Sequence, residues 1–420
     1  MKTVSAGYLS NIGVLAKLAG CIFGVCMVSL LCSCSEKNSD KGEVLSVDVR
    51  ELLKDKDAMK NVFATDEIET VEYIPLEITQ DDASLIAGIL DFSVSDDFIY
   101  ILPIKENKIL QFDKKGHFIK NVVTHGEGPN EYNGFPQNIY VDDAMDRLYI
   151  ANMDKTWEYT LSGEFVAVRK RDNMISYEYK IAPDRYAAVS YLGVPFHIPG
   201  IFGIGVFSEQ EDTVAMKKNF LSPENVPEEV SGFTNVTVAW NQNSVLFKTA
   251  SNDTVFRLTK DEIAPAYILN LRNSAQEIVR GLKVRNSDGA APDDIWVWDM
   301  LETPSYFYYR FMLDNNFYIG ALNRLTGTAS WEHCSTPTDD IYQLVQLNRL
   351  LALTGMKSSK TNAPFWGSCF KDELVQIITA PEWVFFKEKG LVQGLDNITE
   401  DDNPIVVIAK VKDSCDVSHK

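Results

Sequence analysis

The sequence predicts an all-β protein: a six-bladed β-propeller with a few short decorating helices. Two ladders of repeated residues and the length of the chain predict this fold. A chain of 420 residues with 45% apolar residues can form one closed propeller and bury a sizeable core. The first unit, within residues 96–132, alternates polar and apolar residues, turns, alternates again and ends in a loop rich in Gly and Pro.

The first ladder is an aromatic residue followed by a turn and a strand. It is clear in Phe112–Ile119 and returns in Tyr159–Val166, with Gly116 and Gly163 at the same place in the turn. A looser copy, Phe256–Ile263, lies about twice that spacing further along the chain. One degenerate unit is therefore expected between the second copy and the third.

The second ladder is an Asp or Asn, any residue, and then two residues suited to a strand. It occurs six times, beginning at Asp97, Asp146, Asp184, Asn243, Asn315 and Asp372. An Asx side chain bonds the backbone two residues further on and so starts a hairpin into a strand. The six copies predict six repeating blades of the size of a WD40 repeat or larger.

The larger spacings between these copies predict inserted helices. One is a short helix over Ser274–Val284, and a second covers Thr338–Gly355, where apolar residues recur at helical spacing before a glycine stop. A third opens with Thr379 and Glu382 as a capping box and ends near Gly390. These helices are expected to decorate the rim or one face of the propeller.

The two ends of the propeller are expected to lie in one sheet. Ile68–Glu77, near the front, and Pro404–Val411, near the end, both have the composition of strands. Pairing them in one blade would close the ring and remove exposed strand edges, which otherwise invite aggregation. Residues 66–415 are therefore predicted to form the propeller domain.

Residues 1–33 are predicted to be a lipoprotein signal peptide. Lys2 and Lys17 precede an apolar run, Leu18–Leu31, which is long enough for a signal-peptide core and shorter than the ~20 residues that span a bilayer. The run ends in Leu-Cys-Ser-Cys, which resembles the lipobox of bacterial lipoproteins. That resemblance implies cleavage before Cys34 and acylation of Cys34, hence attachment to a membrane; the alternative is an uncleaved anchor with incidental cysteines.

Residues 34–65 are expected to be a polar tether and a lead-in to the propeller. The formal charge of the whole chain is −19, and removal of the signal peptide with its two lysines leaves the mature chain more acidic still. This acidity argues against a nucleic-acid partner, which needs a basic surface. It also argues against adhesion to anionic lipid headgroups through protein charge.

Several segments taken together resemble a largely uncharacterised family of six-bladed β-propeller lipoproteins typical of Bacteroidetes bacteria. They are Tyr73–Glu77 with Ser84–Ile86, Leu110–Asp113 with Gly116–Ile119, Gly126–Pro129 with Glu131 and Tyr132, and Asp402–Pro404 leading into Ala409–Lys412. These segments bracket nearly the whole mature chain. The resemblance implies the fold and a lipid-anchored location in the cell envelope, in the outer membrane. It implies no reaction, because the family has no agreed catalytic motif.

The Gly/Pro loop that ends the first unit carries a motif that is specific only in combination with the terminal Asp-Asn-Pro. Gly126, Gly128 and Pro129 lack the following helix and the Gly-Lys-Ser/Thr ending of a phosphate-binding loop. We expect them to form a tight connection between blades that needs the freedom of glycine and the rigidity of proline. Glu131 and Tyr132 are expected to tie this connection to a neighbouring blade, and a ligand-binding role is the alternative.

No metal or cofactor is predicted from the pattern of candidate ligands. The histidines are scattered and none forms a metal-binding pair along the chain: His117, His125, His197, His333 and His419. The cysteines of the body are too sparse for a disulfide framework or a zinc site: Cys334, Cys369 and Cys415. One Cys334–Cys369 bridge stays open in an oxidising compartment. Spacing along the chain does not exclude a metal site assembled from distant blades.

An aromatic stretch in residues 286–310 supplies the candidate contacts with a ligand or partner. Period-2 alternation places Trp296 and Trp298 on one face of a strand. Aromatic platforms on propeller loops can stack on sugars or anchor protein partners. The alternative is that both side chains belong to the core between two blades.

The expected function is therefore a non-enzymatic binding or interaction scaffold for an extracellular glycan, a peptide or an envelope protein. The alternative is a metal-dependent hydrolase or lyase with its site at the central channel, and a third hypothesis is a structural subunit of an envelope complex. Polar side chains converging at the channel would favour the enzyme. An apolar or aromatic groove on one face would favour binding.

Overall fold

The computed structural model describes most of the chain from Val44 onward. The described residues are 44–59, 68–104, 108–136, 138–152, 154–170, 175–190, 202–218, 236–241, 243–249, 252–272, 295–314, 316–334, 368–370, 373–388, 390 and 392–412.

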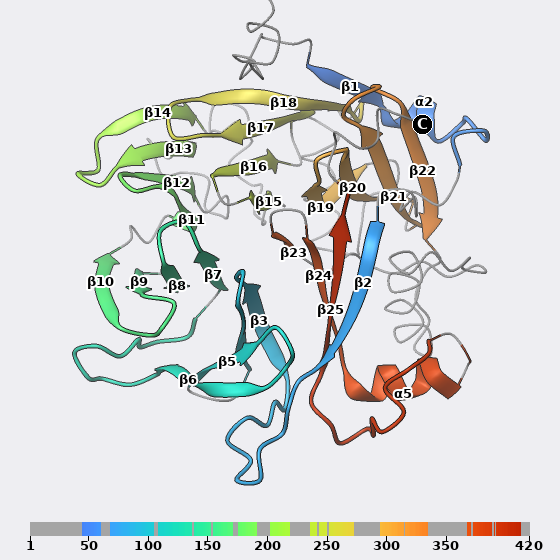
Figure 1. Ribbon diagram of the computed structural model, residues 1–420. Helices are drawn as coiled ribbons and strands as arrows, with labels where there is room; N and C mark the ends of the chain where they lie inside the picture. Colours follow the sequence, from blue (N-terminus) through green and yellow to red (C-terminus); the bar gives the residue numbers. More distant parts are fainter. Residues whose placement is uncertain are drawn as a thin grey trace, which may run out of the picture. The chain divides into compact units, whose positions relative to one another are not determined.

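Six sheets follow one another along the chain and form a six-bladed β-propeller, as the sequence predicts (Figure 1). Blade 1 contains β3 (Ile89–Val94), β4 (Phe98–Pro103), β5 (Lys108–Asp113) and β6 (Phe118–Thr124). Blade 2 contains β7 (Asn138–Asp142), β8 (Arg147–Ala151), β9 (Lys155–Tyr159) and β10 (Phe165–Lys170). Blade 3 contains β11 (Ile175–Ala182), β12 (Arg185–Ser190), β13 (Phe202–Ser208) and β14 (Thr213–Lys218).

The second half of the chain supplies the other three blades. Blade 4 contains β15 (Val236–Asn241), β16 (Ser244–Thr249), β17 (Thr254–Leu258) and β18 (Ile263–Asn270). Blade 5 contains β19 (Trp296–Glu302), β20 (Tyr306–Leu313), β21 (Asn316–Asn323) and β22 (Ala329–Cys334). Blade 6 contains β23 (Ser368–Phe370), β24 (Glu373–Ile378), β25 (Ile405–Val411) and β2 (Ile68–Pro75).

Blade 6 combines the two ends of the propeller, which confirms the predicted pairing. β2 is antiparallel to β25, with Ile68 opposite Val411 and Pro75 opposite Ile405 (Figure 1). β2 is the outermost strand of this sheet and β23 the innermost. The first strand of the ring is thus held by the last strand of the chain.

Apolar side chains between successive sheets hold the blades together. Five clusters of buried residues each join two neighbouring blades: blades 1 and 2, 3 and 4, 4 and 5, 5 and 6, and 6 and 1. Blades 2 and 3 meet through the rings of Tyr140 and Tyr179, whose centroids are 5.2 Å apart. Because blade 6 packs on blade 1, the sheets close on themselves and leave no open end.

The first predicted ladder marks the outer turn of each of the early blades. In blades 1 and 2 the turn bonds Gly116 N to Asp113 O and Gly163 N to Thr160 O. Blade 3 has the same turn with Glu211 in the glycine position, at a φ of 68°, and it is the degenerate unit expected between the copies. In blade 4 the corresponding turn follows Leu258 rather than Phe256, since Thr259 N bonds Glu262 O.

The two glycines of this ladder also let neighbouring blades approach closely. Gly116 and Gly163 have φ values of 86° and 90°. A Cβ on Gly116 would overlap the carbonyl oxygen of Pro75 in β2, and one on Gly163 would overlap that of Val122 in β6. Each outer turn therefore packs its backbone directly on the outer strand of the preceding blade.

The second ladder marks the turn between the first and second strands in blades 1 to 4, as predicted. In blade 5 it marks a different turn. Asp97, Asp146, Asp184 and Asn243 all lie between the first and second strands of their blades. The fifth copy leads into β21, which is the third strand of blade 5. The first hairpin of that blade turns instead at Thr303, whose N–H bonds Tyr306 O. The sixth copy leads into β24, the second strand of blade 6, as expected.

Two helices are present among the described residues. α2 (Val49–Leu52) follows β1, and α5 (Ala380–Glu388) follows β24. The predicted capping box of α5 is confirmed: Thr379 N and Thr379 Oγ1 lie 2.9 Å and 2.8 Å from Glu382 Oε2. The helices predicted at Ser274–Val284 and Thr338–Gly355 lie outside the described residues.

Part of the predicted lead-in joins the propeller as a fifth strand of blade 4. β1 (Leu45–Asp48) pairs in parallel with β18, with Leu45 opposite Tyr267 and Asp48 opposite Asn270. Further on, Met59 forms a bridge with Trp331 of β22. This short segment thus covers the outer edge of blade 4 and reaches blade 5.

A buried asparagine fixes the loop that follows β2 to the segment before β25. Asn403, 1% exposed, accepts a hydrogen bond from Ile86 N at 2.9 Å. Its side-chain amide donates to Glu77 O and Ser84 O, both at 2.8 Å. All three bonds join residues more than 300 positions apart. This contact explains the Asp-Asn-Pro motif of the sequence.

Candidate functional site

The motif loop, residues Gly126–Tyr132, connects blade 1 to blade 2 and is folded around one carboxylate. Glu131 Oε2 accepts a hydrogen bond from Gly128 N at 2.9 Å, and Glu131 N donates to Gly128 O. A Cβ on Gly126 or Gly128 would overlap the Glu131 carboxyl group. The glycines are therefore needed because the glutamate occupies the space that side chains would take.

Tyr132 anchors this loop to blade 2. Its ring is 1% exposed and lies edge-on to that of Trp157 in β9, with the centroids 6.3 Å apart. Its carbonyl oxygen accepts a hydrogen bond from Gly126 N, which closes the loop. The structural role predicted for Tyr132 matches this geometry, whereas Glu131 acts within the loop itself.

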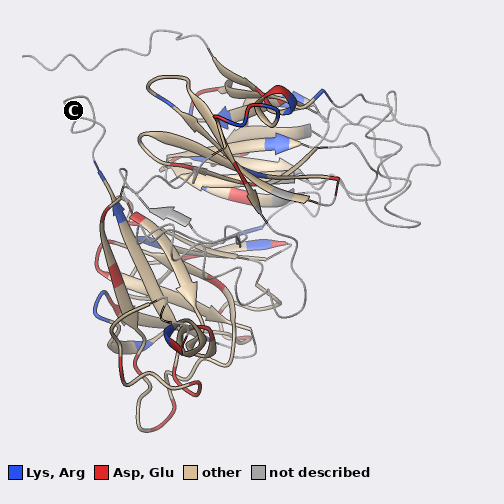
Figure 2. Ribbon diagram, turned by 90° about the vertical axis from the view of Figure 1, so that its right-hand side faces the viewer, with Lys and Arg blue, Asp and Glu red and all other residues tan. Residues whose placement is uncertain are grey.

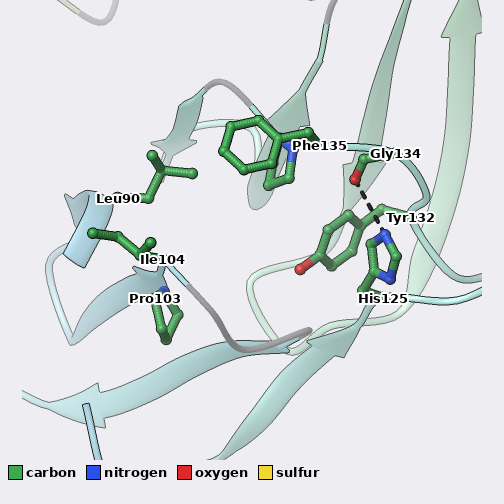
Figure 3. A pocket seen from close by; sticks show the side chains of 8 residues that line it. Leu90, Pro103, Ile104, His125, Tyr132, Gly134 and Phe135 are labelled. Atoms are coloured by element: carbon green, nitrogen blue, oxygen red, sulfur yellow. Dashed lines mark hydrogen bonds between the residues drawn. The ribbon is translucent and has the colours of Figure 1, made fainter. Parts of the chain in front are cut away.

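A cavity of about 270 Å³, the loop pocket, lies between the motif loop and the end of blade 1 (Figure 3). Residues from the beginning of β3, from the end of β4 and from the connection to β7 line it: Leu90, Pro103, Ile104, His125, Tyr132, Gly134, Phe135 and Pro136. Phe135 and Ile104 remain 67% and 51% exposed. The side chains that line the pocket are thus mainly apolar, with polar atoms exposed between them, and its rim is apolar.

Two polar groups stand among these apolar walls. The hydroxyl of Tyr132 points into the pocket and forms no hydrogen bond with the described residues (Figure 3). Burial raises the pKa of Tyr132 to about 12, so the hydroxyl keeps its proton and can donate. His125 Nε2 lies 3.1 Å from Gly134 O and donates to it, which leaves Nδ1 of the neutral ring as an acceptor.

A second and larger cavity, the interblade pocket, lies between blades 2 and 3 and measures about 710 Å³. Its walls come from β8, β9, β10, β11, β12 and the adjoining turns: Met145, Arg147, Tyr149, Glu158, Val166, Ala167, Val168, Arg169, Lys170, Lys180, Pro183, Tyr186, Glu209 and Glu211. This lining is far more charged than that of the loop pocket.

A buried ion cluster forms one side of the interblade pocket. Lys180 Nζ lies 2.9 Å from Glu209 Oε1, 3.6 Å from Glu158 Oε1 and 3.2 Å from the Tyr186 hydroxyl. Burial alone would lower the pKa of Lys180, but the bond to Glu209 and the charge of Glu158 raise it above its ordinary value. Lys180 is therefore a fixed cation that contacts two carboxylates and balances the charge of one of them.

The aromatic residues singled out in the sequence lie on β19. Trp296 is 2% exposed, which is the environment that the core alternative predicts. The strand register shifts between Val297 and Asp299, so the expected alternation is interrupted at Trp298. The side chain of Trp298 and Cys34, the predicted lipid-attachment residue, lie outside the described part of the molecule.

Within the described ranges, no three His, Cys, Asp or Glu side chains are grouped so that they could hold a metal ion. Of the histidines, His125 lines the loop pocket and His117 pairs with Asp113 in an outer turn. Within the same ranges, no helix combines the length and apolar character required to cross a membrane.

Sequence reasoning did not find most of the pocket residues. Phe135 and Ile104 carry no motif, and only the position of Phe135 just after the motif loop could have indicated it. Glu158 and Lys180 lie at interior positions of strands, where charged side chains are uncommon unless paired. Their pairing depends on contacts between two blades, which strand patterns do not encode.

Comparisons with known proteins agree with the fold. A family model described as "Domain of unknown function (DUF4934)" matches residues 46–410. A Bacteroides fragilis protein named as an exported protein has a solved structure with 16% identity and a TM-score of 0.60, covering 88% of this chain and 100% of its own. A member of the duf4221 family from Bacteroides vulgatus has 9% identity and a TM-score of 0.47, covering 83% and 100%. No curated protein matches the chain.

Proposed function

The chain belongs to the family described as Domain of unknown function (DUF4934), and from that premise we propose that it is a non-enzymatic binding scaffold of the cell envelope. The proposed ligand is a ring or side chain of an extracellular glycan, a peptide or an envelope protein. The loop pocket is the observation that carries this proposal, because it combines a formed cavity with exposed apolar groups.

The chemistry of the loop pocket favours a small, mainly apolar group that carries an oxygen acceptor. Its volume of about 270 Å³ fits one ring or one side chain rather than a large cofactor. The ring of Phe135 offers an exposed face for stacking, and the Tyr132 hydroxyl offers one donor. A ligand with an acceptor could therefore take a hydrogen bond from that hydroxyl.

We propose that the protein is exported and anchored by lipid on Cys34. The lipobox-like Leu-Cys-Ser-Cys sequence and the apolar run before it support this location. The name of the Bacteroides fragilis protein, as an exported protein, agrees with it. Several acyl chains on one cysteine would hold the propeller at the outer membrane, since stable anchoring takes more than one chain.

We expect the substitutions Phe135→Ala and Tyr132→Phe to weaken ligand binding while the fold is retained. The first removes the stacking surface and should cost about tenfold in affinity, and the second removes one neutral hydrogen bond and should cost about threefold to tenfold. Calorimetric titration of the full-length protein in detergent would measure this with a panel of neutral mono- and disaccharides and with N-acetylphenylalanine amide.

The matched control is Leu325→Ala, which removes another exposed apolar side chain, 58% exposed, between β21 and β22. It should leave both binding and the thermal midpoint unchanged. The proposal of a binding scaffold fails if no member of the panel binds. The assignment to the loop pocket fails if binding is found but both substitutions leave it intact.

We expect Cys34→Ser to release the protein from the membrane. The substitution removes the thiol that lipid attachment requires, so that metabolic labelling with an alkyne fatty acid and sedimentation with membranes should both be lost. Cys32→Ser is the matched control and should keep both. Sedimentation that survives Cys34→Ser would favour an uncleaved anchor instead.

A further inference from the structure

We propose that the interblade pocket is a second binding site, independent of the loop pocket, and that it takes a small organic carboxylate with an apolar chain. The inference depends on one arginine, Arg169 of β10, and on the side chains around it. It concerns a different part of the molecule from the proposed function and does not depend on it.

The guanidinium of Arg169 is held in position while its donors stay available. It stacks on the ring of Tyr186, with Cζ 4.0 Å from the ring centroid. Its Nε lies 3.4 Å from the buried carboxylate of Glu178, which orients it from one side. The guanidinium makes no hydrogen bond to the described residues. A planar fork with free donors in a cavity wall is the arrangement that binds a carboxylate in bidentate fashion.

The charges of the pocket are close to balanced. Two of its carboxylates, Glu158 and Glu209, contact Lys180. The lining also holds Arg147, Lys170 and Glu211, and Glu178 lies beside Arg169. The chain as a whole has a formal charge of −19, with Asp and Glu spread over many of its loops and turns (Figure 2). The interblade pocket is thus nearly neutral in a strongly acidic chain, so that an anion is repelled less there than over the rest of the surface.

Apolar side chains line part of the cavity, which defines the rest of the ligand. Val166 and Val168 of β10 belong to the lining, on the opposite face of the strand from Arg169, and are 40% and 49% exposed. Met145 and Pro183 complete the apolar lining. The cavity of about 710 Å³ has room for a carboxylate together with an aliphatic chain. A neutral sugar would match the apolar wall less well and would leave the guanidinium unpaired.

The experiment is calorimetric titration of the full-length protein with straight-chain carboxylates from butanoate to octanoate, and with hexanamide as the neutral counterpart of hexanoate. We expect hexanoate to bind, hexanamide to bind about tenfold more weakly or not at all, and added salt to weaken hexanoate binding. Arg169→Gln should reduce hexanoate affinity about tenfold or more. Arg272→Gln, at an ion pair with Asp48 on blade 4, is the matched control and should change nothing.

A second variant keeps the test decisive if Arg169→Gln disturbs folding by removing the cation beside Glu178. Arg169→Lys retains the charge opposite Glu178 but lacks the planar fork, so we expect a normal thermal midpoint and a clearly weaker affinity for hexanoate. The inference is overturned if none of the carboxylates binds, if hexanamide binds as tightly as hexanoate, or if Arg169→Lys binds as the natural protein does. Phe135→Ala alters the loop pocket alone and should leave hexanoate binding intact. The two pockets are therefore tested independently.

Discussion

Gly163→Ala and Gly116→Ala are each expected to lower the free energy of unfolding by about 3–5 kcal/mol. Both residues adopt a φ near 90°, which costs an alanine about 1–2 kcal/mol. The larger part of the loss comes from the neighbouring blade. The new methyl group would overlap a backbone carbonyl, that of Val122 or Pro75, and backbone cannot move aside as a flexible side chain can.

Gly390→Ala is the matched control for this prediction. Gly390 also has a positive φ, 68°, at the end of α5, but no atom lies within 4 Å of the position of its Cβ. It should lose only about 1 kcal/mol. Denaturant unfolding of the three variants measures the difference. If all three lose the same amount, the close approach of the blades does not contribute to stability and the backbone conformation alone explains the glycines.

Asn403→Asp is expected to destabilise the protein by about 3 kcal/mol or more at pH 7. The amide nitrogen of Asn403 donates to the carbonyl oxygens of Glu77 and Ser84, and a carboxylate would present an acceptor to both. The site is buried, so that the new charge would also lack water. This loss falls on the contact that fixes the loop after β2 to the end of the ring.

The pH dependence of the Asn403→Asp variant shows how much of its loss of stability comes from the new negative charge. Burial raises the pKa of a carboxyl group, so the variant should bind a proton more readily when folded than when unfolded. Its deficit relative to the natural protein should therefore shrink as the pH falls from 8 towards 5. Asn397→Asp, at an exposed position in the same loop, is the control and should show neither the loss nor this trend.

Local turn chemistry explains why the fold could be predicted from the sequence. Gly116 and Gly163 marked equivalent outer turns, and Asp97 and Asp146 marked equivalent inner turns, because each such turn depends on one residue with a special backbone preference. Where that residue is replaced, the signal fades. Glu211 occupies the glycine position in blade 3 without any sequence signature of a turn.

The candidate sites were less accessible to sequence reasoning, since they depend on contacts between blades. The motif loop could be recognised, but the cavity beside it needs Leu90 and Ile104 from separate parts of blade 1. The setting of Arg169 depends on Tyr186 and Glu178, which belong to the next blade. No local pattern relates these residues. Trp296 is buried, which is the environment that the core alternative of the sequence analysis describes.

The closing of blade 6 has a consequence for the order in which the molecule is made. β2 emerges early in synthesis, yet its partner β25 is among the last segments, and the contact between Asn403 and Glu77 spans 326 positions. Sheets that depend on such distant partners form late. The chain must lose the conformational entropy of closing a long loop before the strand pairing can stabilise the sheet. A nascent chain therefore cannot complete its ring before β25 has been synthesised.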